Sequence, residues 1–240
     1  MKEEFDKYVS NYPIDNSKIK RKIEHSYRVM ELSKKYATML GFNDYDIKLA
    51  TLIGLIHDIG RFEQVRVYNT FNDRTSIDHA SYGVKILFED GLIKNFWDNT
   101  LDYEVIKFAI ENHNKLEIEP TTNERALMHA KLIRDIDKLD IIYILSYLDE
   151  INLTPTDDDI TKEIIERVEK HQSVLNKDKK NDNDRIVYYL SYIFDVNYNE
   201  CLNEFKKYIN DYYKKIKNND KLKKIYKEVI EYIDERMKLC

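Results

Sequence analysis

The segment at residues 49–60 (LATLIGLIHDIG) constrains the fold of this chain more than any other stretch. It is apolar on nearly every side of a helix, and this pattern indicates a helix that is buried rather than one that lies on the surface. The segment ends in His57 and Asp58, and burying an imidazole and a carboxylate is costly unless each has a partner. A metal ion suits both groups. We therefore expect more ligands elsewhere in the chain to face this end of the helix.

Glycine and proline are scarce, with 5 Gly and 3 Pro among 240 residues. This composition favours long helices with few tight turns, so we expect an all-α protein. The chain is long enough to bury a sizeable core. Beyond about Pro155 the sequence becomes denser in mixed charge, Tyr and Asn. We expect a helical domain over residues 1–153, followed by a helical C-terminal extension over residues 154–240 that packs on it.

Charge and cysteine content exclude several classes of function. The net charge of −5 gives no overall attraction to nucleic acid or to an anionic membrane. The basic and aromatic segment 206–227 is interrupted by Asp and Asn, so a solvated helix face or a subunit contact explains it better than a nucleic-acid site. Cys201 and Cys240 imply no disulfide framework.

The start of the chain is too polar for a signal peptide, and the longest apolar run is far shorter than the roughly 20 residues of a membrane helix. We therefore expect a soluble, cytoplasmic protein. The sequence does not determine its oligomeric state.

Four of the six histidines fall on apolar helix faces. A helix that Asn16 or Ser17 caps and Gly41 ends carries His25 in register with Val29 and Leu32. The helix from about Asp44 turns His57 inward, and its Gly54 allows another element to approach closely. Residues 61–75 show no clear periodicity, so we expect a loop there.

Three more helices carry polar groups on an apolar face. Thr75 or Ser76 is expected to cap the helix that holds His79, and a helix over about 102–112 leads to His113. The next helix places Asp137 on its apolar face. Beyond Pro155, the segments 157–175, 184–195 and 198–238 also look helical.

A single buried histidine is more often an ordinary core residue than a metal ligand, but four of them with an adjacent His-Asp pair reverse those odds. Mixed imidazole and carboxylate ligands suit manganese, iron, zinc or cobalt better than magnesium or calcium. Six ligands exceed what one catalytic metal with open positions usually takes from protein, which favours two metals. The candidate ligands are His25, His57, Asp58, His79, His113 and Asp137.

The strings IEHSYRV, GLIHDIGRFEQ, SIDHASYG, IENHNK and IRDIDKLD, spread over about residues 20–145, resemble the HD-domain superfamily of metal-dependent phosphohydrolases. The resemblance implies an all-α core of five or more helices with metal ligands facing each other across its centre. His25, His57, Asp58 and Asp137 match the core ligands of this superfamily. His79 and His113 match the two additional histidines of its dinuclear branch, in which Asp58 would bridge both metals. Residues 150–240 match no motif that we can name.

The same resemblance favours Asp137 over its neighbours Asp135 and Asp140, which we interpret as a solvated or hydrogen-bonded pair. His129 and His171 are interpreted as surface or boundary residues. Asp78 either hydrogen-bonds a ligand imidazole or lies in the first turn of its helix.

The expected reaction is hydrolysis of a phosphate ester or phosphoanhydride, of a nucleotide or another small molecule, by a metal-activated hydroxide. Asp58 and Arg61 are the catalytic candidates, because related proteins often carry a phosphate-contacting Lys where Arg61 lies. Arg61 has a structural alternative, a pair with Glu63, and Lys138 has one with Asp135 or with a solvent-facing carboxylate. Cationic and polar residues near the ligands are the candidates for substrate binding: Arg28, Arg61, Arg66, Asn114, Arg134 and Lys138.

Aromatic residues in segments 61–75 and 88–101 either stack on a nucleobase or close the core; they are Phe62, Tyr68, Phe71 and Trp97. Two other functions fit the same pattern. One is a di-iron HD-domain oxygenase acting on a small polar substrate, and the other is a non-catalytic nucleotide-binding module whose metal is structural.

Overall fold

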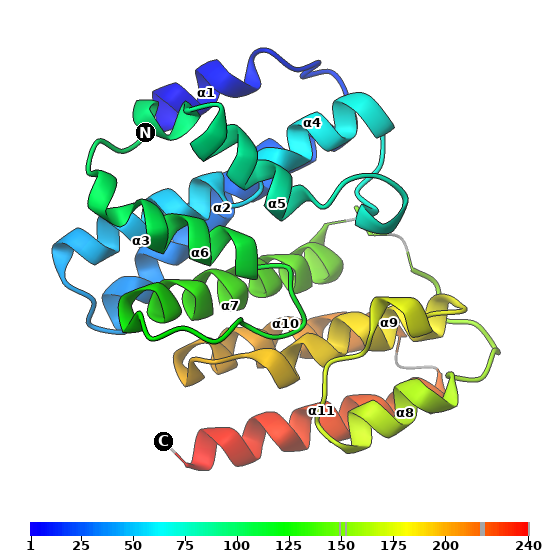
Figure 1. Cartoon of the computed structure of the whole chain (residues 1–240). Coiled ribbons are helices and arrows are strands. Elements are labelled where there is room, and N and C mark those ends of the chain that lie inside the picture. The colour runs from blue at the N-terminus through cyan, green and yellow to red at the C-terminus, as the bar shows by residue number, and fades with distance from the viewer. Residues whose placement is uncertain (149, 152, 217–218, 240) are drawn as a thin grey trace. The chain divides into compact units, whose positions relative to one another are not determined.

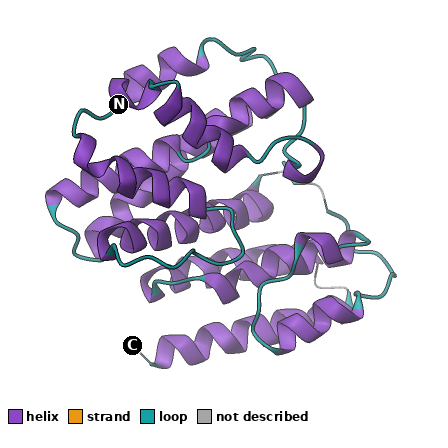
Figure 2. Ribbon diagram, in the orientation of Figure 1, coloured by secondary structure: helices purple, strands orange, loops and turns teal. Residues whose placement is uncertain are grey.

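The structure is a computed structural model that describes residues 1–148, 150–151, 153–216 and 219–239. Helices and their connecting loops make up these ranges, and no strand occurs within them (Figures 1 and 2). The expected all-α class is therefore confirmed. Cys240 and two residues of the expected helical segment 198–238 lie outside the described residues.

Contacts between Cα atoms divide the chain into two compact units, Met1–Asp137 and Lys138–Cys240. The division falls inside a helix, earlier than the expected boundary after residue 153, and that domain assignment stays a prediction. The first unit contains α1 (Lys2–Val9), α2 (Ser17–Met39), α3 (Asp44–Ile56), α4 (Ile59–Tyr68), α5 (His79–Val84), α6 (Tyr103–Asn112) and the first part of α7 (Glu124–Tyr147).

The helices α2 and α3 lie side by side (Figure 1); α2 begins at an expected cap and α3 at the expected residue, Asp44. The side chain of Asn16 accepts a hydrogen bond from the backbone of Lys18 at the start of α2. After α2, Gly41 adopts φ +72°, a conformation that glycine tolerates best. At Gly54 a Cβ atom would lie 2.6 Å from Ser33 Oγ, so the absence of a side chain lets α2 and α3 approach closely.

The expected loop at residues 61–75 is wrong over most of its length, because α4 occupies Ile59–Tyr68. Its buried residues Ile59, Phe62 and Val65 follow one another at intervals of three, which is a helical spacing. The polar and aromatic residues between them obscured this short apolar pattern in the sequence. The helix ends at Asn69, which adopts a left-handed conformation.

The cap of α5 also differs from the expectation. Asp78, rather than Thr75 or Ser76, is the N-cap, and its side chain accepts a hydrogen bond from Ser81 N. Asp78 therefore takes the second of its two expected roles, the one at the start of the helix.

The aromatic residues considered for nucleobase stacking have different positions. Phe62 is fully buried, and its ring packs against Phe5, so it closes the core. Trp97 donates a hydrogen bond to Asp102, and Tyr68 is exposed. Phe71 lies in the loop after α4.

The second unit holds the rest of α7 with α8 (Lys162–Glu169), α9 (Asp182–Leu190), α10 (Leu202–Ile216) and α11 (Asp220–Lys238). α11 contacts α8, α9 and α10. α8 is much shorter than the expected segment 157–175. In the basic and aromatic segment, buried residues such as Ile209 and Ile225 alternate with exposed lysines. Cys201 is buried in this unit.

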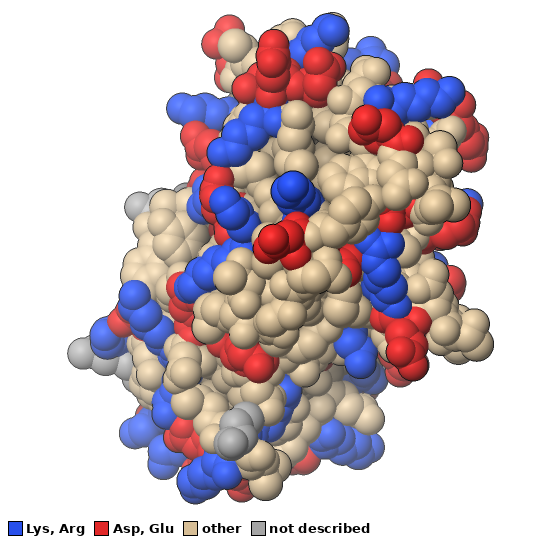
Figure 3. All heavy atoms as spheres, turned by 90° about the vertical axis from the view of Figure 1, so that its left-hand side faces the viewer, with Lys and Arg blue, Asp and Glu red and all other residues tan. Residues whose placement is uncertain are grey.

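The surface in Figure 3 carries basic and acidic side chains interspersed with each other, without a large area of one sign on that face. Among the described residues, every helix is too short or too polar to cross a lipid bilayer.

Candidate metal centre

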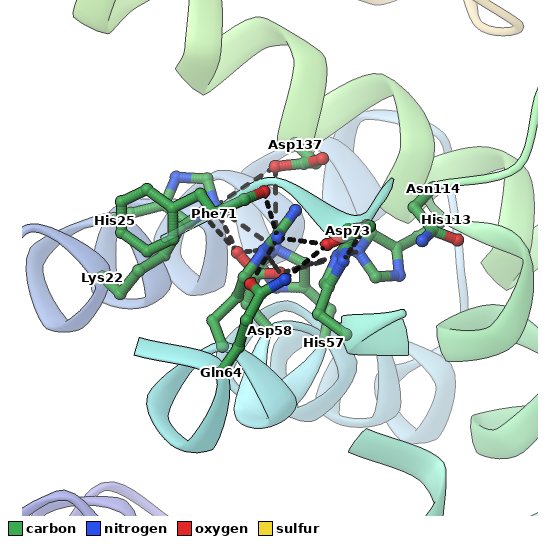
Figure 4. Close-up of polar contacts among 12 residues, drawn as sticks. Lys22, His25, His57, Asp58, Gln64, Phe71, Asp73, His113, Asn114 and Asp137 are labelled. Atoms are coloured by element: carbon green, nitrogen blue, oxygen red, sulfur yellow. Dashed lines mark hydrogen bonds and ion pairs between the residues drawn. The ribbon is translucent and has the colours of Figure 1, made fainter. Parts of the chain in front are cut away.

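Six helices, α2 to α7, meet at a cluster of imidazoles and carboxylates. α2 contributes His25, α7 contributes Asp137, and the junction between α3 and α4 contributes His57 and Asp58. These side chains point toward a common centre (Figure 4). All six predicted ligands belong to groups of three whose candidate donor atoms lie within 4.8 Å of one another: His25, His57, Asp58, His79, His113 and Asp137.

One half of the cluster is built around His25 and His57. His25 Nε2 lies 3.1 Å from Asp137 Oδ1 and 3.4 Å from Asp58 Oδ2. His57 Nε2 lies 3.6 Å from each of the same two oxygens. This half therefore combines two imidazoles with two carboxylates.

The other half is built around His79 and His113. His79 Nε2 lies 3.3 Å from Asp58 Oδ1, and His113 Nε2 lies 3.6 Å from the same oxygen. The two oxygens of Asp58 thus face different pairs of imidazoles. A carboxylate in this position can serve two metal ions, one on each oxygen.

Local helix geometry orients two of the imidazoles. His57 and His113 are the C-cap residues of α3 and α6, where the last backbone carbonyls have no partner within the helix. His57 Nδ1 lies 2.9 Å from Gly54 O, and His113 Nδ1 lies 2.6 Å from Ile110 O. Since a carbonyl only accepts, each Nδ1 donates, and the Nε2 lone pair of the neutral ring faces the centre.

His79 is oriented by a carboxylate that our sequence analysis missed. Its Nδ1 lies 2.7 Å from Oδ2 of Asp73, which belongs to the 3-10 helix Asp73–Thr75 in the loop between α4 and α5. Burial raises the pKa of Asp73, but the hydrogen bond and charge of His79, with Arg61 and Gln64, lower it to about 2. Asp73 is therefore ionised at neutral pH and accepts the proton of Nδ1. No sequence pattern links these two residues, because the conformation of the loop brings them together.

The nitrogen atoms are spaced as ligands of shared ions would be. His79 Nε2 and His113 Nε2 are 3.0 Å apart, and His25 Nε2 and His57 Nε2 are 3.3 Å apart. Two nitrogens that each lie about 2.1 Å from one ion are roughly 3.0–3.4 Å apart at octahedral or tetrahedral angles. Lone pairs that face each other at this distance repel unless a cation lies among them. The residues present therefore fit divalent transition metals.

A second residue missed from the sequence, Lys22, is the cation closest to the carboxylate of Asp58. It lies one helical turn before His25 on α2, and its Nζ is 2.5 Å from Asp58 Oδ2. Burial raises the pKa of Asp58, but Lys22 and the imidazoles of His57, His113 and His25 together outweigh it and hold this pKa well below its usual value. Asp137 behaves in the same way, since bonds from His25 and His57 outweigh the effect of burial on its pKa. Both carboxylates are ionised and can bind metal.

Arg61, the predicted catalytic cation, lies beside the centre but is held by the loop after α4. Its Nη1 donates to Gln64 Oε1 at 2.6 Å, to Phe71 O at 2.8 Å and to Asp73 Oδ1 at 2.6 Å. Its Nε lies 3.6 Å from Asp58 Oδ1. The alternative pairing with Glu63 is wrong, because Arg66 pairs with Glu63 instead.

The other predicted substrate-binding residues contact groups outside the cluster. Arg134 donates to the carbonyls of Asn112, Lys115 and Leu116 and so holds the loop after α6. Asn114 donates to Asp78. Arg28 is half-buried on α2.

Lys138 belongs to the second compact unit and forms an ion pair with Asp195. Substrate binding by Arg28, Arg66, Asn114, Arg134 and Lys138 stays a prediction that none of these contacts supports.

Two interpretations of individual residues need correction. His129 is not a surface or boundary residue, because it is 1% exposed and lies 3.0 Å from Asp46. Asp135 and Asp140 are both buried, which excludes the solvated alternative. His171 is partly exposed and pairs with Glu228, as a boundary residue would.

Comparison with known proteins agrees with this geometry. The family model described as "HD domain" matches residues 23–142, which is half of the chain. No curated protein and no solved structure matches the chain.

Proposed function

The chain belongs to the HD-domain family, a superfamily of metal-dependent phosphohydrolases, and on this premise we propose that it hydrolyses a phosphate ester or phosphoanhydride of a nucleotide or another small molecule. The observation that carries the proposal is the position of Asp58. Its two oxygens face two separate pairs of imidazoles, which is the arrangement that a dinuclear centre requires.

Two groups of residues would hold the metals, each of which would be manganese, iron, zinc or cobalt. His25, His57 and Asp137 form one group with Asp58 Oδ2, and His79 and His113 form the other with Asp58 Oδ1. When bound, such metals generate a hydroxide nucleophile at neutral pH and offset the negative charge on phosphoryl oxygens.

Lys22 is the cation that we assign to the substrate. Its ammonium contacts one carboxylate oxygen and lies 5.4 Å from the centre of the Phe71 ring, so it has donors to offer to a phosphoryl oxygen. Nη1 of Arg61, by contrast, already has three acceptors, while its Nε has no hydrogen-bond partner and lies 3.6 Å from Asp58 Oδ1. We therefore propose that Lys22 binds the phosphoryl group and that Arg61 holds the loop beside it.

The charge of the centre supports an anionic substrate. Asp58 and Asp137 contribute two negative charges, which two divalent ions more than neutralise, and Lys22 adds a further positive charge. A buried surplus of positive charge attracts a phosphate dianion and stabilises the charge that builds up during its hydrolysis.

The test is phosphate release from a panel of nucleotides and small phosphate esters with Mn²⁺. His57→Ala and Asp58→Ala should each lower the rate by more than about 100-fold, because metal sites lose 10–100-fold even when supporting residues change. Asp78→Asn is the matched control, since this exposed carboxylate precedes His79 in sequence but caps α5 instead. Equal rates in the wild type and the two alanine variants would exclude hydrolysis at this centre.

The same ligand set suits the di-iron oxygenase of this superfamily, so oxygen uptake by iron-loaded protein is measured alongside. Oxygen uptake without phosphate release would replace the proposed hydrolase function by the oxygenase function. Bound metal without either activity would leave a nucleotide-binding module with a structural metal. The nucleotide nature of the substrate and the cytoplasmic location remain predictions.

A further inference from the structure

His57, His113 and His79 are not held in the same way at Nδ1. His57 and His113 donate their Nδ1 protons to neutral backbone carbonyls at the ends of their helices. His79 donates its Nδ1 proton to the carboxylate of Asp73. A hydrogen bond to an ionised acceptor is roughly twice as strong as one between neutral groups, and it makes the imidazole more basic at Nε2.

Asp73 is itself fixed by the residues around it. Its Oδ1 accepts from Arg61 Nη1 at 2.6 Å and from Gln64 Nε2 at 2.8 Å. Gln64 is fully buried and also contacts Ser76 Oγ and the carbonyl of Ile77. One oxygen of the Asp73 carboxylate thus accepts hydrogen bonds from residues of α4, and the other accepts from the imidazole of His79. Its geometry does not depend on the mobility of an exposed side chain.

The two halves of the centre also differ in charge. The half with His25 and His57 faces two carboxylates, Asp137 and Asp58. The half with His79 and His113 faces the other oxygen of Asp58, at 3.3 and 3.6 Å, and an oxygen of Asp137 lies within 4.8 Å of His113. Asp73 adds a further negative charge behind His79.

We propose that Asp73 is a positioning residue that determines the affinity of the metal position formed by His79 and His113. It acts through the Nδ1 proton of His79, and Arg61 serves to hold it. The inference rests on the dinuclear centre of the proposed function, and it makes the two metal positions unequal. Loss of Asp73 would convert a centre for two metals into a centre that holds one tightly.

The experiment titrates Mn²⁺ into chelator-treated protein and counts the ions bound, with affinities from calorimetry. The wild type should bind two ions. Asp73→Asn keeps the size of the side chain but removes the charge, and it should weaken the second ion by about 10–100-fold while leaving the first unchanged. Asp73→Glu should restore part of the loss. Asp78→Asn changes the carboxylate next to His79 in sequence, which accepts from Ser81 N and Asn114 Nδ2 instead of from the imidazole, and it should bind both ions like the wild type.

Two results would overturn the inference: an unchanged second affinity in Asp73→Asn, or an equal loss of both ions, which would indicate general damage to the fold. A measurement on the wild type does not depend on the variant folding. The Nδ1 proton of His79 should resonate at low field in the proton spectrum, and its absence would contradict the bond to Asp73.

These outcomes are separable from the fate of the proposed function. Binding of two ions without phosphate release would refute hydrolysis and leave the role of Asp73 intact. Phosphate release by the wild type, with an unchanged affinity for the second ion in Asp73→Asn, would support hydrolysis and refute the role of Asp73. A wild type that binds one ion would refute both the dinuclear centre and the inference.

Discussion

Two buried clusters of histidine and aspartate lie at opposite ends of α3, and only one of them is suited to bind metal. The first is the candidate metal centre at the C-terminal end of the helix. The second lies at the N-terminal end, where Asp46 contacts His129 Nε2 at 3.0 Å and Arg125 Nε at 2.6 Å. Arg125 also contacts the buried carboxylate of Asp102 at 2.5 Å.

The difference between the clusters is the balance of donors and acceptors. At the N-terminal end, the guanidinium of Arg125 neutralises much of the charge of Asp46 and Asp102. The indole of Trp97, the hydroxyl of Tyr45 and the amide of Asn43 supply further donors. At the C-terminal end, two carboxylates and four inward-facing imidazole nitrogens lie beside Lys22, and Arg61 Nε is 3.6 Å from Asp58 Oδ1. An excess of acceptors, and not the presence of histidine and aspartate, therefore distinguishes the metal centre.

Among variants that test the difference between the two clusters, Arg125→Met should have the largest effect, a loss of stability. The change leaves Asp46 and Asp102 buried without their cation, and breaking a buried pair in this way costs about 3 kcal/mol of unfolding free energy. Urea unfolding measures the loss. Metal content should stay at the wild-type value because no residue of the metal centre contacts Arg125. An unchanged unfolding midpoint would show that the guanidinium does not balance this cluster.

Lys22→Met should have the next largest effect, and on catalysis instead of folding. Removing a charged donor to the phosphoryl group costs about 1.5–3 kcal/mol. This corresponds to a loss of roughly 10–100-fold in kcat/KM. The number of bound metal ions should not fall, because lysine is not a ligand.

Lys20→Met is the control for this variant, since Lys20 is an exposed lysine on the same helix. If Lys22→Met keeps the full kcat/KM of the wild type, the substrate contact belongs to another residue.

The smallest effect concerns the pH dependence of stability. Burial lowers the pKa of His129, and the contact with Asp46 only partly opposes this. The unfolded chain therefore takes up a proton near pH 6.5 while the folded protein does not, so stability falls as the pH decreases below that value. The slope from one such group is at most about 1.4 kcal/mol per pH unit.

Urea midpoints at pH 7.5 and 5.5 test this expectation. The midpoint of the wild type should fall more between the two values than that of His129→Gln. An equal fall in both proteins would assign the pH dependence to other groups.

Helical periodicity was sufficient to predict much of the centre. Each of His25, His57 and His113 shares a face with apolar residues that the core must cover, so its inward direction follows from the local pattern. The caps Asn16 and Gly41 were also predictable, because they depend only on the backbone next to them. Periodicity failed at His129, whose burial depends on the packing of Phe42 and α3 against α7.

The sequence by itself determined the helical class, the inward-facing ligands and the resemblance to the HD-domain superfamily, since these depend on residue type and on spacing within one element. Only the tertiary structure decided which charges surround those ligands. Lys22 reaches Asp58 across 36 residues of sequence, and Asp73 reaches His79 through a loop without a periodic pattern. Such contacts depend on how helices pack and loops fold back, and spacing along the chain does not encode them.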